Sequence, residues 1–369
     1  MNDGWWGEGS PTYHYYPLRA MLLSADAVRC RNINLYDRKL YKMLVAPASG
    51  VYADLYFPAH NDGWYGESLI AQVSLYEIAC QRYNNDPFFL SVLQQCYRYT
   101  DRNFGEALQN NIEIPQVTSM ETWPSVHFKE TGYAVLRSGT KTVVMKYGPH
   151  GGGHGHPDKL SISIHDGEKE IVSDMGTCAY GVPAFTKWYR KTLSHSTLTV
   201  DAKDQKESTG KLLAFKAYKD GGEVSAEAPD AYSGVTMERK LILKKNKLTD
   251  ILTARSDEQH LYDYVLILTE KPVFSQTGEV IILNDSPSYN YIKNAIVRKQ
   301  SSPLSCKIGK AYMKMFQAPE TLGEALRQRG AVLRSCANYP GLGPGWYRTA
   351  VRTAPENLQL LKALQKVLA

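Results

Sequence analysis

Three of the nine histidines lie close together in the stretch Tyr147-Gly148-Pro149-His150-Gly151-Gly152-Gly153-His154-Gly155-His156-Pro157-Asp158-Lys159-Leu160. Residues 142–146 before it and 160–165 after it alternate apolar and polar side chains, which is typical of half-buried strands. The stretch is therefore predicted to be a glycine-rich loop between two strands. Glycine lets the backbone approach a ligand closely, and imidazole binds metals or transfers protons. We expect the functional residues to converge on this loop.

Before residue 110 the apolar residues recur every three or four positions, which predicts helices. Ser10-Pro11 is a helix start signal. Helices are predicted from there to about residue 30, over 35–45 with Pro47 ending it, from about 67 to 83, and from Pro87 to about residue 104. Two segments resemble each other, Asn2-Asp3-Gly4-Trp5-Trp6-Gly7-Glu8 and Asn61-Asp62-Gly63-Trp64-Tyr65-Gly66-Glu67. This self-similarity predicts a repeat of helical hairpins.

From Tyr133 onward short β-rich runs dominate, separated by turn signals such as Asp166-Gly167 and Asp220-Gly221-Gly222. The runs cover 133–138, 142–147, 160–166, 170–174, 193–200, 213–218, 235–244, 247–254, 261–269 and 280–283. Many short strands joined by turns favour an antiparallel β-sandwich. The predicted fold class is therefore α+β multidomain, with helical hairpins first and the sandwich second.

With 369 residues, 43% of them hydrophobic, the chain is long enough for two globular domains. Five of its six net positive charges lie from Thr321 onward, so the body is nearly neutral and nucleic-acid binding is not expected. No apolar run is long enough to span a membrane, and no signal-peptide pattern follows Met1. Trp5-Trp6 directly before a helix start is typical of a domain interior, so we expect the natural protein to extend further upstream. The sequence indicates no oligomeric state.

Four residues are candidate metal ligands. His154 and His156 are two positions apart, so their side chains point the same way in an extended backbone. Asp174, at a strand end, and His195, predicted to lie in mid-strand, could complete a set suited to Zn²⁺.

Two other motif readings are weaker. Residues 151–153 could cradle a phosphate, but no Gly-Lys-Ser/Thr follows them. The pattern His154-x-His156-x-Asp158 also begins the signature of metallo-β-lactamase-type hydrolases. However, Lys159 replaces the final histidine of that signature, and helices in the first half of the chain do not fit that fold.

Several ordered blocks resemble the heparinase II/III-like polysaccharide lyases, which include heparin and heparan sulfate lyases and alginate and oligoalginate lyases. These blocks cover residues 148–160, 174–177, 180–181, 188–190 and 193–201. Residues 3–16 resemble the helix of the family's α/α toroid that carries a catalytic tyrosine. The resemblance covers roughly residues 1 to 270. It implies part of an α/α toroid over 1–120 and a β-sandwich over 121–318, and leaves 319–369 as a basic tail of unclear structure.

The resemblance also implies roles for individual residues. Tyr13 and His154 correspond to catalytic residues, and Tyr180 or Tyr189 corresponds to the catalytic tyrosine that the sandwich supplies. The zinc ligands correspond to His156, Asp174 and His195, and the zinc is structural. Arg190 is expected to anchor a carboxylate or sulfate of the substrate, and Asn61, Trp64 and Tyr65 are expected to line sugar subsites.

Members of the family cleave acidic, uronate-containing polysaccharides by β-elimination, with histidine and tyrosine as acid and base. They act in the periplasm or cell envelope. The resemblance places a group that neutralises the substrate carboxylate about fifty residues before Tyr13, which would make this chain a fragment. Two alternatives stay open: a non-catalytic carbohydrate-binding remnant, and a zinc hydrolase that uses His154, His156 and Asp158.

Overall fold

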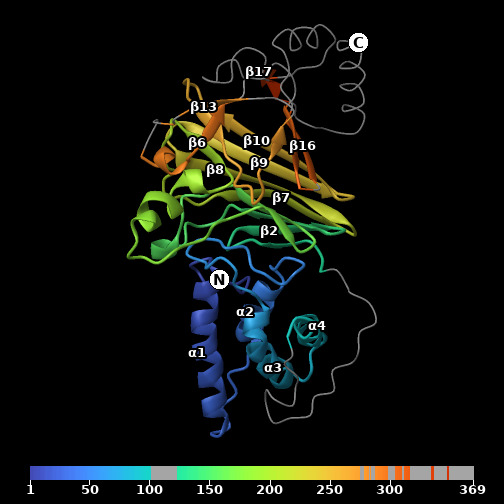
Figure 1. Ribbon diagram of the computed structural model, residues 1–369. Helices are drawn as coiled ribbons and strands as arrows, with labels where there is room; N and C mark the ends of the chain where they lie inside the picture. Colours follow the sequence, from blue (N-terminus) through green and yellow to red (C-terminus); the bar gives the residue numbers. More distant parts are fainter. Residues whose placement is uncertain are drawn as a thin grey trace.

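The computed structural model describes residues 1–100, 123–274, 278–281, 283, 287–297, 304–309, 311–315, 334–335 and 347–348. Helices occupy one end of the molecule and β-sheets the other, with the helices beneath the first sheet (Figure 1). This order confirms the predicted α+β class, in which helical hairpins precede an antiparallel sandwich. The predicted boundary near residue 120 and nearly all of the 319–369 tail lie outside the described residues.

The described residues of the helical part form four α-helices and a short 3-10 turn. They are α1 (Pro11–Arg29), α2 (Arg38–Ala48), η1 (Ile70–Gln72), α3 (Val73–Arg82) and α4 (Pro87–Cys96). Asp37 caps α2 by accepting hydrogen bonds from the backbone of Lys39 and Leu40, and Asp86 caps α4 in the same way. Helix α4 ends at Cys96, earlier than predicted.

Pro47 does not end α2, contrary to the prediction, but lies inside its last turn. Proline has no N–H to donate to the carbonyl of Met43, four residues earlier. The ring of His14 in α1 lies 2.8 Å from that carbonyl oxygen through Nε2 and satisfies it instead. The helix therefore tolerates the proline because a neighbouring helix supplies the missing donor.

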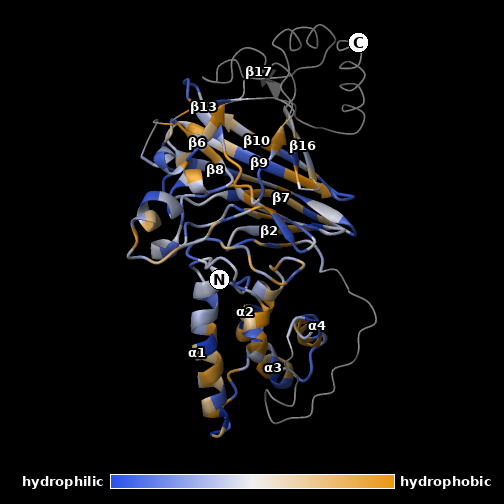
Figure 2. Ribbon diagram, viewed as in Figure 1, coloured by the Kyte–Doolittle hydropathy of each residue, from blue (hydrophilic) through white to orange (hydrophobic). Residues whose placement is uncertain are grey.

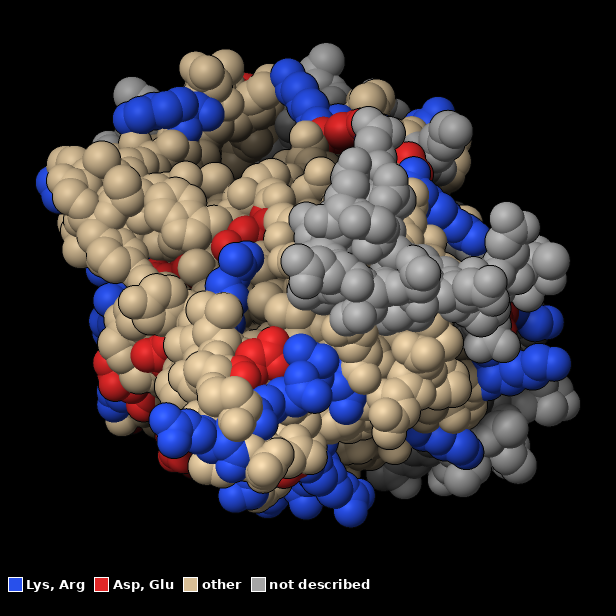
Figure 3. All heavy atoms as spheres, turned by 90° about the horizontal axis from the view of Figure 1, so that it is seen from below, with Lys and Arg blue, Asp and Glu red and all other residues tan. Residues whose placement is uncertain are grey.

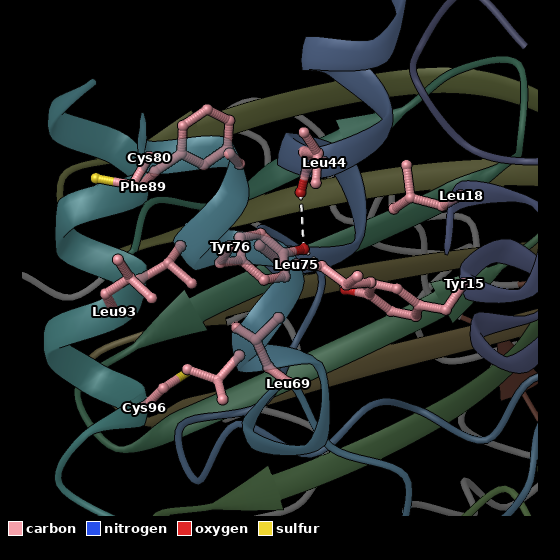
Figure 4. Close-up of a cluster of buried hydrophobic side chains, with 14 of the residues drawn as sticks. Tyr15, Leu18, Leu44, Leu69, Leu75, Tyr76, Cys80, Phe89, Leu93 and Cys96 are labelled. Carbon is pink, nitrogen blue, oxygen red and sulfur yellow. Dashed lines mark hydrogen bonds between the residues drawn. The ribbon is translucent and has the colours of Figure 1, made fainter. Parts of the chain in front are cut away.

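The four helices share one apolar core, shown in Figure 4. Leu18, Leu44 and Phe89 come from three different helices and are fully buried. The hydroxyl of Tyr76 at the centre donates to the carbonyl oxygen of Leu44 at 2.8 Å and bonds the hydroxyl of Tyr15. The core therefore holds even its polar atoms in hydrogen bonds, as burial requires.

Two antiparallel sheets form the sandwich. The first runs in chain order through β1 (Val126–Phe128), β2 (Tyr133–Ser138), β3 (Lys141–Lys146), β4 (Ser161–Asp166) and β5 (Lys169–Val172). The second has the order β10 (Lys247–Arg255), β9 (Val235–Lys244), β8 (Gly221–Tyr232), β7 (Lys211–Tyr218). Burial alternates along β9, and the strands of this sheet mix apolar and polar residues in Figure 2. Apolar residues of both sheets, such as Leu136 and Met237, form the core between them.

Smaller elements complete the described part of the chain. β6 (Leu198–Val200) pairs with β11 (Tyr262–Tyr264). A three-stranded sheet has β15 (Leu304–Ile308) between β12 (Val273–Phe274) and β16 (Ala311–Met315). Two further pairs are β13 (Glu279–Ile281) with β14 (Ala295–Val297) and β17 (Arg334–Ser335) with β18 (Tyr347–Arg348). The short helices are η2 (Gly152–His154), η3 (Phe185–Tyr189), η4 (Thr192–Ser194) and η5 (Tyr289–Tyr291).

Two sequence predictions in the sandwich are wrong. Strand β8, the longest of the second sheet, is missing from the predicted strands, because Gly221-Gly222 is typical of a turn. The two glycines in fact begin the strand, directly after a tight hairpin that pairs Tyr218 with Gly221. His195 is not in mid-strand: it follows η4 in extended backbone, and the next strand begins only at Leu198.

An apolar layer joins the helical part to the first sheet. Trp5, Ala46 and Tyr52 pack there against Phe128 and Val144. On the face seen from below, basic and acidic side chains are interspersed (Figure 3), as expected for a nearly neutral body. Among the described segments, no helix combines the length and apolar character needed to cross a membrane.

Candidate functional site

The glycine-rich loop lies between β3 and β4, as predicted, and packs against the N-terminal segment of the chain. Gly151 has a φ of +96°, and a Cβ there would lie 2.6 Å from the carbonyl oxygen of Glu8. A Cβ on Gly155 would collide with the carbonyl oxygen of His150. Glycine is therefore needed at both positions, because the loop folds back on itself and touches the segment before α1.

Three side chains that can transfer protons meet at the solvent-facing edge of this loop. Tyr13 comes from α1, His154 from η2 and Tyr180 from the segment after β5. The rings of Tyr13 and His154 stack with centroids 3.6 Å apart and an interplanar angle of 18°. The hydroxyls of Tyr13 and Tyr180 are hydrogen-bonded to each other, and Tyr180 is 51% exposed. A ligand from solvent can therefore reach all three residues at one place.

Tyr180, and not Tyr189, joins the Tyr13–His154 pair. The hydroxyl of Tyr180 donates to Oδ2 of Asp62 at 3.1 Å. Partial burial, together with the hydrogen bonds to Tyr13 and Asp62, raises the pKa of Tyr180 well above the usual value of a phenol. Tyr180 therefore keeps its proton at neutral pH. Tyr189 lies on η3, where its carbonyl accepts a hydrogen bond from Ser194.

Glu8 also touches this group, although no motif in the sequence marks it as a site residue. Its Oε1 lies 3.1 Å from Nδ1 of His154, which is an ion-pair distance without hydrogen-bond geometry. Its other oxygen accepts from the indole N–H of Trp6 at 3.2 Å. The one available signal is its position at the end of the repeated segment 2–8.

Behind the exposed residues lies a buried polar cluster, made up of Lys146, His156, Asp158, Lys159, Asp174 and His195. One ligand atom from each of Asp158, Asp174 and His195 lies within 4.8 Å of the other two. In the described part of the chain, Nδ1 of His156, Oδ1 of Asp158 and both ring nitrogens of His195 have no hydrogen-bond partner. Buried polar atoms are rarely left unpaired, and carboxylate with imidazole is a typical metal ligand set. The cluster therefore fits a metal ion.

The set of grouped ligands differs from the predicted one in one member. Asp174 and His195 belong to it as expected, with Oδ1 of Asp174 3.4 Å from Nδ1 of His195. Asp158 belongs to it in place of His156, whose ring lies beside it with its centroid 5.2 Å from that of His195. Nε2 of His156 is held by Asp62 at 3.0 Å, so only its Nδ1 is available to a metal ion.

Asp158 is also the counter-ion of two buried lysines. Its Oδ2 lies 2.5 Å from Nζ of Lys146, and its Oδ1 lies 3.5 Å from Nζ of Lys159. Burial alone would raise the pKa of Asp158, but the two ammonium groups outweigh burial and lower it strongly. Burial lowers the pKa of Lys159 to about 8 and that of His156 to about 4. His195 is also fully buried, yet Asp174 raises its pKa.

Asn61 lies beneath the loop and not on a surface that a sugar could reach, contrary to expectation. It is 1% exposed, and its amide nitrogen donates to the carbonyl of Glu8 at 2.7 Å. Its Oδ1 accepts from Lys146 and from the backbone N–H of His156. Asn61 therefore connects the N-terminal segment to the buried polar cluster.

Asp62 is the second residue that sequence reasoning missed. It is buried, and it bonds His156 through one carboxylate oxygen and Tyr180 through the other. Burial would raise its pKa, but the hydrogen bond and the charge of His156 outweigh burial and lower it. The signal in the sequence is its match with Asp3 in the repeated segments.

The remaining predicted substrate-binding residues are at least partly accessible. Trp64 is 48% exposed and Tyr65 is 61% exposed. The hydroxyl of Tyr65 donates to Glu170 at 2.7 Å, and burial of Glu170 raises its pKa to about 7. Arg190 donates one hydrogen bond to the carbonyl of Gly155 at 2.9 Å, and its guanidinium lies 5.6 Å from the centre of the Phe185 ring.

Residues 120–266 match the family profile described as heparinase II/III-like, C-terminal. An alginate lyase of Stenotrophomonas maltophilia is 27% identical over an alignment of 306 positions that covers 72% of this chain and 40% of the relative. An exo-oligoalginate lyase of Saccharophagus degradans is 29% identical over an alignment of 150 positions that covers 34% of this chain and 20% of the relative. A threonine-phosphate decarboxylase of Salmonella typhimurium shares only a short stretch of 37 residues at 57% identity, 10% of each chain.

The crystal structure of heparan sulfate lyase HepC from Pedobacter heparinus superposes with a TM-score of 0.62 at 20% identity, over 74% of this chain and 42% of that one. This similarity shows a shared fold. The chain spans less than half the length of these lyases. Profile, relatives and fold agree that residues 120–266 are similar to the C-terminal domain of the heparinase II/III-like family.

Proposed function

We propose that this chain carries the site of a polysaccharide lyase that cleaves uronate-containing polysaccharides by β-elimination. The observation that carries the proposal is the stacking of Tyr13 on His154, with Tyr180 hydrogen-bonded to Tyr13, at an accessible edge. Imidazole and phenol are the groups that exchange protons in such a reaction. The names of the two lyase relatives, alginate lyase and exo-oligoalginate lyase, support the same reaction class.

The reaction needs a base and an acid and consumes no water. The base removes the proton at C5, beside the uronate carboxylate, and the electron pair forms the C4–C5 double bond. The C4–O4 bond breaks, and the acid gives its proton to O4 of the leaving sugar. The products are an unsaturated uronate end and an intact hydroxyl end.

In this proposal His154 accepts the C5 proton and Tyr13 gives its proton to O4. Glu8, 3.1 Å from Nδ1 of His154, favours a proton on that nitrogen and leaves Nε2 as the basic atom. The carboxylate also stabilises the imidazolium that forms when Nε2 takes up the proton. Tyr180 has a raised pKa and therefore serves Tyr13 as a hydrogen-bond partner and not as a base.

A structural Zn²⁺ belongs to the proposal. Asp174 and His195 would hold it, with Asp158 or His156 as a further ligand. The ion would supply positive charge that braces the buried polar cluster beneath the loop. The residues that we assign to proton transfer lie in front of that cluster, at the accessible edge.

The proposed substrate is an acidic polysaccharide or oligosaccharide. Arg190 uses one N–H for Gly155, and its remaining donors can pair with a carboxylate or sulfate. Trp64 and Tyr65 expose aromatic surface on which sugar rings can stack. The domain limits of 120 and 318, and action in the periplasm or cell envelope, remain part of this proposal.

The test is to incubate the protein with alginate, heparan sulfate and hyaluronate and to follow the ultraviolet absorption of the unsaturated product. We expect product from at least one polymer, and rates lower by about 10²- to 10⁴-fold for His154→Ala and Tyr13→Phe. Tyr16→Phe is the matched control, because Tyr16 lies on the same helix but is 80% exposed. Its rate should equal that of the wild type.

Three results would contradict the proposal. Full activity in both His154→Ala and Tyr13→Phe would remove the assigned acid and base. Polysaccharide binding with no product would support the carbohydrate-binding alternative. New reducing ends without ultraviolet absorption would indicate a hydrolase.

A further inference from the structure

We propose that Asp62 is a positioning residue that fixes two protons of the site: it holds His156 with Nδ1 free for a metal ion, and it orients the hydroxyl of Tyr180. The second half of this proposal rests on the proposed lyase function, whereas the first half does not. Asp62 would touch neither the substrate nor the metal.

The geometry places one carboxylate between the buried polar cluster and the exposed residues. Asp62 is 1% exposed, with Oδ1 3.0 Å from Nε2 of His156 and Oδ2 3.1 Å from the hydroxyl of Tyr180. Its backbone N–H donates to the carbonyl oxygen of His154 at 3.1 Å. One residue of the segment before η1 therefore contacts three of the predicted functional residues.

A carboxylate accepts hydrogen bonds and has none to give, so both of its partners must donate. His156 must then carry its proton on Nε2, which leaves the lone pair of Nδ1 free. Nδ1 is the ring atom that has no hydrogen-bond partner in the described part of the chain. Metal-binding histidines commonly donate their other ring N–H to a carboxylate, which fixes both the tautomer and the orientation of the ring. The contact with Asp62 therefore prepares His156 as a ligand.

The same logic orders the two phenols. The hydroxyl of Tyr180 donates its one hydrogen bond to Asp62. The oxygen of Tyr180 can therefore only accept in the hydrogen bond that joins it to Tyr13. Tyr13 is then the donor, and without substrate its hydroxyl proton points toward the oxygen of Tyr180. The hydroxyls of Tyr13 and Tyr180 and the carboxylate of Asp62 form a chain with a single polarity.

Asp3 provides a matched comparison inside the same chain. It occupies the equivalent position of the repeated segment, but its Oδ2 accepts from the backbone N–H groups of Glu130 and Thr131 at 2.8 Å each. It contacts no member of the buried polar cluster among the described contacts. Asp3→Asn is therefore a matched control, because it replaces a carboxylate by an amide outside the site.

The first experiment measures zinc affinity by chelator competition in the wild type, Asp62→Asn and Asp3→Asn. In Asp62→Asn, the amide that replaces the carboxylate can accept from only one of the two donors and turns an NH₂ group toward the other. We expect zinc affinity to fall by about 10- to 100-fold in Asp62→Asn and to stay unchanged in Asp3→Asn. Equal affinity in Asp62→Asn and the wild type would overturn the first half of the proposal.

The second experiment needs no substitution, so it tests the role of Asp62 toward His156 even if Asp62→Asn fails to fold. Long-range ¹H–¹⁵N spectra of the ¹⁵N-histidine-labelled, zinc-free chain report which ring nitrogen of His156 carries the proton. We expect the proton on Nε2 and a bare Nδ1. A proton on Nδ1 would overturn the proposal.

The third experiment tests the phenol half. Tyr180→Phe removes the hydroxyl without touching His156, so zinc affinity should stay at the wild-type value. Asp62→Asn and Tyr180→Phe should each lower kcat about tenfold or more with little change in KM, and the double variant should be no slower than the slower single variant. Additive losses would overturn this half. If the wild type makes no unsaturated product, the lyase function fails with the phenol half, while the zinc and tautomer results still decide the role of Asp62.

Discussion

Residues 2–8 and 61–67, the first and second turn segments, share the pattern Asn-Asp-Gly-Trp-Trp/Tyr-Gly-Glu but attach to different parts of the sandwich. In the first turn segment the aspartate holds the turn between β1 and β2, through Thr131. In the second turn segment the aspartate holds His156 and Tyr180. The same local sequence therefore has a structural task in one place and a task in the site in the other.

For the two glutamates that end these segments the roles are exchanged: the glutamate of the first turn segment, and not that of the second, lies near the site. Glu8 of the first turn segment approaches His154. Glu67 of the second accepts from the hydroxyl of Thr12, whose oxygen in turn accepts from the backbone of Trp64. A repeat supplies a reusable turn, and the surface against which the turn packs decides which of its polar residues acquires a role in the site.

The largest effect is expected in the buried polar cluster that the second turn segment covers. Asp158→Ala leaves the ammonium of Lys146 buried without its carboxylate partner. We expect the free energy of unfolding, measured with urea, to fall by about 3–5 kcal/mol. Glu227→Ala is the control, because its partner Lys211 is 72% exposed, and a loss of about 0–1 kcal/mol is expected there.

A loss below about 1 kcal/mol in Asp158→Ala would mean that the cluster does not depend on this ion pair. The two turn segments would then cover surfaces of similar character, and the contrast between them would disappear.

A smaller, pH-dependent effect is expected at the first turn segment. Nδ1 of His14 lies 3.1 Å from the backbone nitrogen of Trp6 and accepts its N–H, and burial lowers the pKa of His14 to about 4. The unfolded chain takes up this proton below about pH 6.5, the folded chain only below about pH 4. Between these values the unfolded state binds more protons, so stability falls as the pH falls, by up to about 3 kcal/mol.

His14→Asn keeps an acceptor for Trp6 but does not titrate, so urea unfolding from pH 7 to 4.5 should show a shallower loss of stability. His60, whose pKa burial also lowers to about 4, should preserve part of the slope. An unchanged slope in His14→Asn would show that His14 is not the responsible group.

The smallest effect is expected when the two glutamates are compared by the same substitution. Glu8→Gln removes the negative charge beside His154 and should lower kcat about tenfold, which corresponds to about 1.4 kcal/mol. Glu67→Gln should leave kcat within about twofold of the wild type, because Thr12 can donate equally well to an amide oxygen. The initial rate of unsaturated product at saturating substrate measures both. Equal losses would show that neither segment has a special relation to His154.

Local pattern predicts the regular parts of the fold well. The alternation of apolar and polar residues gives β2 and β9 with their observed limits. Strand β8 is not predicted because its first residues are Gly221 and Gly222, which also fit a turn. Pro47 fits a helix end because nothing local reveals that His14 replaces its missing hydrogen bond.

The candidate site also contains residues that can be recognised from the sequence and residues that cannot. Tyr13, His154 and Tyr180 are recognisable from motif blocks, and the structure brings them together. Asp62 and Lys146 are not recognisable, because their importance comes entirely from partners distant in sequence and from burial. Local spacing carries no information about such contacts.

The contact between Tyr13 and Tyr180 also has a kinetic consequence, because these residues are 167 positions apart in the chain. Contacts between distant residues form late, after the entropy of closing the intervening chain has been lost. The helical part can acquire its own core earlier from contacts within residues 15–96. During refolding, helical circular dichroism should therefore return before any signal from the site, and the site would report the last docking event between the two halves of the molecule.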